Sequence, residues 1–169
     1  MTRVTSTRLT VALLLAGVLF CTPAAMTQAP AAPAAATQPA APQALTYELA
    51  VQVIDAAEAE ARKNKWNVTI VVTDAAGMPV VLRRLTGASP RSYDIASRKA
   101  ATVVAAKMTT AEYGVKLKTK EVTEVPNGIT FAGGVPIMRG TEFIGAVATS
   151  GVQAIQDEQI SKAGASAIK

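Results

Sequence analysis

Residues 131–151 read FAGGVPIMRGTEFIGAVATSG and contain five glycines among twenty-one residues. A glycine-rich run holds phosphate when it leads from a strand directly into a helix, as in G-x-G-x-x-G or G-x-x-x-x-G-K-[ST]. Here Gly133 and Gly134 lead into a further β-type run, and no lysine follows at the spacing of the second motif. The stretch therefore predicts glycines that serve a sheet, where a glycine lets another backbone or a flat ligand come close.

This stretch and the residues just before it predict three strands. ITFAGG (129–134) and VPIMRG (135–140) are two short runs that meet at a kink. TEFIGAVATSG (141–151) then alternates, with Phe143, Gly145, Val147 and Thr149 on one face. Because Arg139-Gly140-Thr141 has turn chemistry, we expect a hairpin to join the last two runs.

Two further runs predict another hairpin. WNVTIVVTD (66–74) is β-branched and almost wholly apolar, which favours a strand buried on both faces. The turn sequence DAAG follows it, and MPVVLRRL (78–85) is the second strand, with Pro79 tolerated near its start.

Helical spacing of apolar residues is found in residues 45–65, 89–108 and 152–169. Thr46 is predicted as the N-cap of the first helix, and Ser89 as the N-cap of the second with Pro90 in its first turn. Within residues 109–127, TTAEYGV predicts a short helical turn and the remainder a loop. The predicted order is α-β-β-α-β-β-β-α. Hairpins separated by helices indicate an antiparallel sheet packed with helices, a layered α+β domain of the broad α/β class.

The N-terminal segment, residues 1–25, has the pattern of a secretory signal peptide. Two arginines precede an apolar run from Leu9 to Phe20, and Thr22-Pro23-Ala24 resembles a cleavage site. The apolar run is short for a bilayer span, so no stable membrane insertion is expected after the leader is removed. Cys21 lies inside the segment, and lipidation of this cysteine is disfavoured by the bulky Phe20 before it. We therefore expect a periplasmic or extracellular protein.

Residues 26–44 consist almost entirely of Ala, Pro, Thr and Gln. Repeated prolines break helices and strands, and nothing in the segment is large enough to form a core, which predicts a disordered tether. The folded domain is therefore expected to span residues 45–169. Its mature chain has no cysteine, so the domain must be held together by its apolar core.

The charge of the mature chain is only mildly basic. Loss of the two leader arginines lowers the net charge from +5 to +3. Lys116, Lys118 and Lys120 alternate with other residues and have few aromatic neighbours, which is more typical of a solvated face than of a nucleic-acid site. We predict no nucleic-acid partner.

Six stretches in order resemble the GlcG/HbpS-type heme-binding proteins, a family related to the C-terminal domain of some corrinoid adenosyltransferases. The stretches are VVTDAAGMPV (71–80), RLTGAS (84–89), SYDIASRKAATV (92–103), GGVPI (133–137), IGAVATSG (144–151) and QDEQISKAG (156–164). The resemblance covers nearly all of residues 45–169. It implies an α/β fold with a five-stranded antiparallel sheet, assembly into homo-oligomers, and binding of heme or a related tetrapyrrole.

The chain has no histidine, so an imidazole ligand to heme iron is excluded. Tyrosine or methionine can hold the iron instead, or the ring can bind through its propionates and apolar faces. The side chains that could reach the iron are Tyr47, Tyr93, Tyr113, Met78, Met108 and Met138. Each of them could equally be a packing residue.

Two cations are the predicted anion-binding residues. Arg84 lies at a strand end before a glycine turn, where it could meet a carboxylate without burial. Lys99 falls on the inward face of its helix, which requires an anionic partner. This partner is either a ligand or an internal acid, namely Asp74, Asp94 or Asp157. The predicted cofactor-binding set is Arg84, Lys99, Gly133, Gly134, Gly145 and Tyr113, with the glycines providing clearance for the ring.

The prediction is a secreted heme-binding protein that acts as a carrier, a scavenger or a sensor accessory. No catalytic residue and no metal site is predicted, because the mature chain lacks the histidine and cysteine on which triads, thiol chemistry and common zinc sites depend. Two alternatives stay open. The domain could be an enzyme or accessory domain acting on a small acid or a corrinoid, or an oligomeric scaffold without a ligand.

Overall fold

The computed structural model describes residues 44–168, which form four helices and four strands in one sheet. The predicted signal peptide, and the tether up to its last residue, lie outside the described residues. In chain order the elements are α1 (Tyr47–Lys63), β1 (Thr69–Asp74), β2 (Pro79–Arg84), α2 (Arg91–Ala106), α3 (Thr110–Lys118), β3 (Gly134–Arg139), β4 (Glu142–Ser150) and α4 (Ala154–Ala165). No helix in this part of the chain has the length and apolar character needed to cross a membrane.

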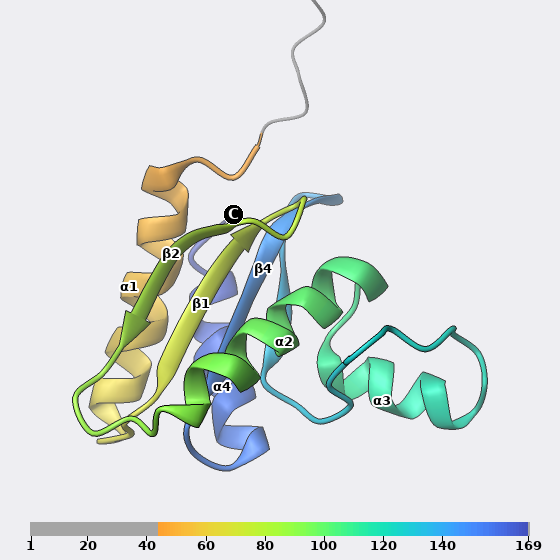
Figure 1. Cartoon of the computed structure of the whole chain (residues 1–169). Coiled ribbons are helices and arrows are strands. Elements are labelled where there is room, and N and C mark those ends of the chain that lie inside the picture. The colour runs from red at the N-terminus through yellow and green to blue at the C-terminus, as the bar shows by residue number, and fades with distance from the viewer. Residues whose placement is uncertain (1–43, 169) are drawn as a thin grey trace, which may run out of the picture. The chain divides into compact units, whose positions relative to one another are not determined.

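The sheet is antiparallel throughout, with the strand order β2-β1-β4-β3. Both predicted hairpins are present, and β4 pairs with β1 at the centre, Val71 lying opposite Ala148. α1 and α4 cover one face and α2 covers the other, as Figure 1 shows. The predicted layered α+β fold class is confirmed.

Alternate residues of β1 belong to two different cores. Ile70 and Val72 pack with the apolar side of α1, including Val53 and Ile54. Val71, between them, packs instead on the alanines of α2. A strand that buries both its faces is apolar on both, which explains the run of β-branched residues, and the buried Thr69 hydroxyl is hydrogen-bonded to the Ser92 hydroxyl at 2.7 Å.

The sheet has four strands among the described residues, whereas five were predicted. ITFAGG (129–134) does not form a strand up to Gly133. The Ile129 N–H donates to the Thr102 hydroxyl at 2.9 Å rather than to a neighbouring strand. Gly133 has a φ of +130°, which breaks the extended run just before β3 begins.

Helix boundaries follow local capping with one exception. The Thr46 hydroxyl accepts a hydrogen bond from the Leu49 N–H at 3.3 Å, as predicted for an N-cap. The predicted Ser89 cap is wrong, because α2 begins without a side-chain cap and the Ser89 backbone carbonyl accepts from the Ser92 N–H. TTAEYGV forms most of the nine-residue helix α3 rather than a single turn.

Candidate functional site

Three of the predicted site residues meet where α2 crosses the start of β3 and the end of β4. A Cβ atom placed on Gly133 would contact the Lys99 Nζ, and one on Gly134 would lie 3.0 Å from the Lys99 backbone oxygen. Tyr113 lies nearby on α3, whereas Arg84 ends β2 at the far edge of the sheet. Gly145 lies towards the opposite end of β4. The six predicted residues therefore do not form one site.

Lys99 is completely buried, and its ammonium group is bound inside the domain. Its Nζ donates to Asp157 Oδ2 at 2.8 Å and to the Thr149 carbonyl oxygen at 2.9 Å. It also lies 5.0 Å from the centre of the Phe131 ring. The predicted internal ion pair is confirmed, with Asp157 as the acid.

Burial has a larger effect on the pKa values of Lys99 and Asp157 than their mutual attraction has. It lowers the pKa of Lys99 and raises the pKa of Asp157, and the attraction between the two groups acts in the opposite direction on each. The other Asp157 oxygen, Oδ1, accepts a hydrogen bond from the Val152 N–H at 3.2 Å. Asp157 thus ties the end of β4 to α2 and α4.

The predicted glycines are closely packed by the chain itself. The Gly133 carbonyl accepts hydrogen bonds from the Ser161 hydroxyl at 2.8 Å and from the Thr149 N–H at 2.9 Å. A Cβ on Gly134 would lie 2.8 Å from side-chain atoms of Thr110 and Val103. A Cβ on Gly145 would contact the Thr73 carbonyl oxygen. Atoms of this domain fill the space beside each of these glycines.

Tyr113 is buried in the wall of a hollow of about 440 Å³. Its hydroxyl oxygen accepts a hydrogen bond from the Val125 N–H at 2.7 Å, which fixes the loop that follows α3. Glu121 and Glu124 also line this hollow, so its charge does not favour an anionic ligand. The structure gives Tyr113 a role in holding this loop.

Arg84 is exposed, and its Nη2 donates to the Ala88 carbonyl oxygen at 2.6 Å. It points to the α2 side of the sheet, because its partner Thr69 hydrogen-bonds the Ser92 hydroxyl of α2 at 2.7 Å. Leu82 lies on the same side, since it pairs with Val71. α2 lies over β1, β4 and β3 and leaves this side of β2 uncovered.

An open face results beside α2, defined by Leu82, Arg84 and Tyr93. Leu82 is 39% exposed and Tyr93 53%. The direction of Tyr93 follows from Val104, which lies 3.6 Å from the Cβ position of Gly77 in the β1–β2 turn. Eleven residues make three helical turns, so Tyr93 lies on the same side of α2 as Val104. From the sequence, Tyr93 could not be distinguished from the other two tyrosines. Its place on the open face depends on which strand α2 leaves uncovered.

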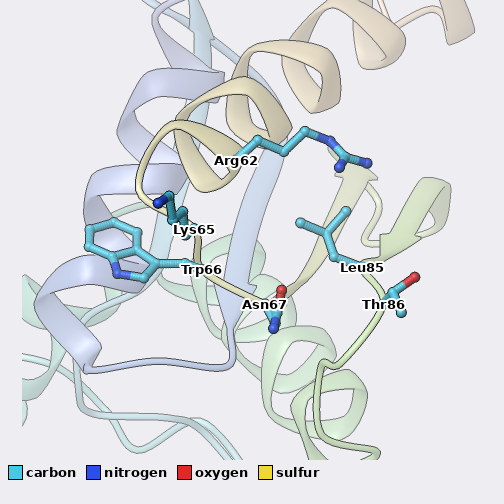
Figure 2. A pocket seen from close by; sticks show the side chains of 6 residues that line it. All are labelled: Arg62, Lys65, Trp66, Asn67, Leu85 and Thr86. Atoms are coloured by element: carbon cyan, nitrogen blue, oxygen red, sulfur yellow. The ribbon is translucent and has the colours of Figure 1, made fainter.

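A basic hollow of about 310 Å³ lies between the end of α1 and the chain after β2. Figure 2 shows Arg62, Lys65, Asn67, Leu85 and Thr86 around it. The Trp66 ring points away from these five side chains. Arg62 is partly neutralised by Glu58. No sequence motif marks this hollow, because its lining combines exposed and half-buried side chains from two separate segments of the chain.

Nearly the whole folded domain matches a known protein family. Residues 45–166 match the family described as "Haem degrading protein HbpS-like". The chain belongs to the HbpS-like family. The predicted resemblance to GlcG/HbpS-type proteins is thereby confirmed.

Two solved structures and one further relative are similar to this chain. A double mutant of HbpS from Streptomyces reticuli is 32% identical with a TM-score of 0.70, covering 82% of this chain and 98% of that one. PduOC, solved as a complex with heme, is 28% identical with a TM-score of 0.64, covering 75% and 96%. The protein GlcG of Escherichia coli strain K12 is 32% identical over 108 residues, which is 63% of this chain and 81% of GlcG.

The described part of this HbpS-like chain contains no group of three or more histidine, cysteine, aspartate or glutamate residues that could hold a metal ion. A heme would bring its own iron, which is held by axial side chains such as tyrosine rather than by a cluster of metal-binding residues. Of the three tyrosines, Tyr47 and Tyr93 are exposed and Tyr113 is buried. Tyr93 is the exposed tyrosine on the open face, where Arg84 also lies.

Proposed function

We propose that this protein binds heme or a closely related tetrapyrrole. The observation that carries the proposal is the relative solved with heme, which is 28% identical and matches 75% of this chain with a TM-score of 0.64. The family description, which names heme chemistry, supports the same ligand class.

The open face has the groups that a heme requires. Leu82 offers exposed apolar surface for the ring, and burial of such surface away from water is favourable. Arg84 is a cation at the rim, where a propionate can be bound with a charge-assisted hydrogen bond and without full burial. Its present partner, the Ala88 carbonyl oxygen, is a neutral acceptor that leaves the positive charge uncompensated.

Tyr93 is the side chain proposed to hold the iron. Tyrosine is an established axial ligand, and this hydroxyl is exposed on the open face. A heme bound here supplies iron-centred redox chemistry, and the protein contributes orientation through Tyr93 and charge neutralisation through Arg84. Lys99 has a different role, because its ammonium group is buried and already bound to Asp157.

A shallow face on one chain covers only one side of a flat ligand. The hollows described above, of 310 and 440 Å³, are at the lower end of the range for pockets that enclose small molecules. We therefore propose that a second copy of the chain covers the other side of the heme, in a homo-oligomer. Export by the predicted leader would place this oligomer in the periplasm or outside the cell, as a carrier, scavenger or sensor accessory.

Hemin titration of the purified protein followed by absorbance tests the proposal. A saturable, sharpened Soret band is expected, and Arg84→Gln should weaken binding about tenfold through loss of a charge-assisted bond. Arg62→Gln, which changes the basic hollow instead, is the matched control and should leave affinity unchanged. Absence of saturable binding by the folded parent protein would overturn the proposal. A loss of hemin affinity in Arg62→Gln alone would indicate that heme binds in the basic hollow.

A further inference from the structure

A separate hollow of about 400 Å³ lies between the first turn of α2 and the end of β4. Arg91 and Ile95 of α2 line it together with Ser150, Gly151 and Val152 at the start of the β4–α4 connection. We call it the α2 hollow. It shares no lining residue with the open face or the basic hollow.

Ser150 is the unusual residue in this hollow. It is only 6% exposed and lines the hollow, yet its hydroxyl has no hydrogen-bond partner within residues 44–168. Among residues 44–168 the one buried side-chain oxygen without a partner is Thr73 Oγ1, so the Ser150 hydroxyl is not sealed in the core but is reached through the hollow. A hydroxyl that opens to the hollow and has no partner in the domain can form a hydrogen bond with a ligand there.

Positive charge faces the same hollow. Arg91 forms no ion pair or hydrogen bond through its guanidinium in the described part of the chain. It stands in the first turn of the sixteen-residue helix α2, whose N-terminus has no side-chain cap and carries the positive end of the helix dipole. Asp94, the acid in this turn, lies 3.8 Å from Arg98 and is directed to that cation.

The floor of the hollow is held by the buried ion pair. The Val152 N–H donates to Asp157 Oδ1, while Asp157 Oδ2 is bound by the Lys99 ammonium group. The negative charge beneath the hollow is therefore balanced, and it does not repel an anion. Ile95 and Val152 add an apolar wall to the polar groups of Arg91 and Ser150.

We propose that the α2 hollow binds the carboxylate group of a small organic acid. The guanidinium of Arg91 can donate two parallel hydrogen bonds to a carboxylate, and the Ser150 hydroxyl can donate a third. The apolar wall formed by Ile95 and Val152 suits a short aliphatic tail. A site with one cation favours a monoanion over a phosphate, which carries more charge and needs more donors.

This inference does not depend on the proposed heme function, although heme also carries carboxylates. The ligand could be a free acid or a heme propionate, and the two sources differ in how Arg91 affects hemin binding. A free acid predicts that Arg91→Gln leaves hemin affinity unchanged. A propionate predicts that Arg91→Gln weakens hemin but leaves hemin dimethyl ester, which has no free carboxylate, unaffected.

The test is an NMR titration of the full chain with sodium propionate against sodium chloride at equal ionic strength. We expect saturable shifts of backbone amides confined to residues 91–95 and 150–152. Arg91→Gln should weaken propionate binding about tenfold or more, and Ser150→Ala by a smaller factor. Arg62→Gln, a loss of the same charge at the basic hollow, is the matched control and should bind propionate like the parent.

Three results would overturn the inference. These are the absence of saturable shifts with propionate, shifts that persist in both Arg91→Gln and Ser150→Ala, and inorganic phosphate binding at least as tightly as propionate at the same residues. Circular dichroism and thermal melting of each variant confirm that lost binding is not lost folding. Arg91 is exposed and Ser150→Ala removes a single oxygen, so both variants are expected to fold.

Discussion

Lys99 Nζ lies 2.8 Å from Asp157 Oδ2, and these two residues, fifty-eight positions apart in the chain, are both buried in the domain. Removal of one partner leaves the other as an uncompensated buried charge. Lys99→Met is therefore expected to lower the free energy of unfolding by about 3–5 kcal/mol, measured by urea denaturation. The double variant Lys99→Met/Asp157→Leu should recover much of this loss, because it removes both charges. Equal stability of Lys99→Met and the parent would show that the pair is not buried in solution.

Glu58 predicts an acid dependence of stability. Burial raises its pKa, but hydrogen bonds and charges from Arg83 and Arg62 together lower the pKa below its ordinary value of 4.5. The resulting stabilisation is present above pH 4.5 and is lost as the pH falls through the lower folded-state pKa. The free energy of unfolding should therefore decrease between about pH 5 and pH 3, and Glu58→Gln should reduce this decrease. Glu124→Gln, at an exposed loop acid, is the control and should follow the parent.

Helical periodicity was sufficient to place Lys99 inside the domain. Its inward position required an anionic partner, and Asp157 was one of three acids named. The choice among them could not be made from the sequence, because it depends on how α4 packs against the end of β4. A contact between residues far apart in the chain leaves no local pattern at either one.

The predicted fifth strand shows that a local sequence pattern can also predict an element that does not form. ITFAGG (129–134) has a strand-like composition, but its N-terminal backbone hydrogen bond goes to the Thr102 hydroxyl of α2. The open face was also hidden from the sequence, since it exists only because α2 covers β1, β4 and β3 and not β2. Arg84 was predicted from its position at a strand end, whereas Tyr93 required the three-dimensional arrangement.

Gly145 tests whether a glycine serves packing or ligand clearance. A Cβ at this position would contact the Thr73 carbonyl oxygen and would lie 3.0 Å from Leu45 Cδ2. Gly145→Ala should therefore cost about 1–3 kcal/mol of stability in thermal or urea unfolding, with little change in the hemin affinity of the folded protein. Gly140→Asn is the control, because Gly140 has no atom within 4 Å of its Cβ position and asparagine tolerates its φ of +60°. Unchanged stability with weakened hemin binding would instead assign Gly145 to the ligand.

Tyr93 predicts the spectrum of the heme complex. With no histidine in the chain, a tyrosinate on the open face should give ferric heme a high-spin spectrum with a phenolate-to-iron charge-transfer band. Tyr93→Phe removes the ligating oxygen and keeps the ring, so the charge-transfer band should disappear and hemin affinity should fall. Ultraviolet–visible and resonance Raman spectra of the two proteins make the comparison. Tyr47→Phe is the matched control, because Tyr47 is 61% exposed but lies at the start of α1, which covers the opposite face of the sheet. If both variants keep the parent spectrum, tyrosine does not hold the iron; if only Tyr47→Phe loses the band, the site lies on the α1 side of the sheet.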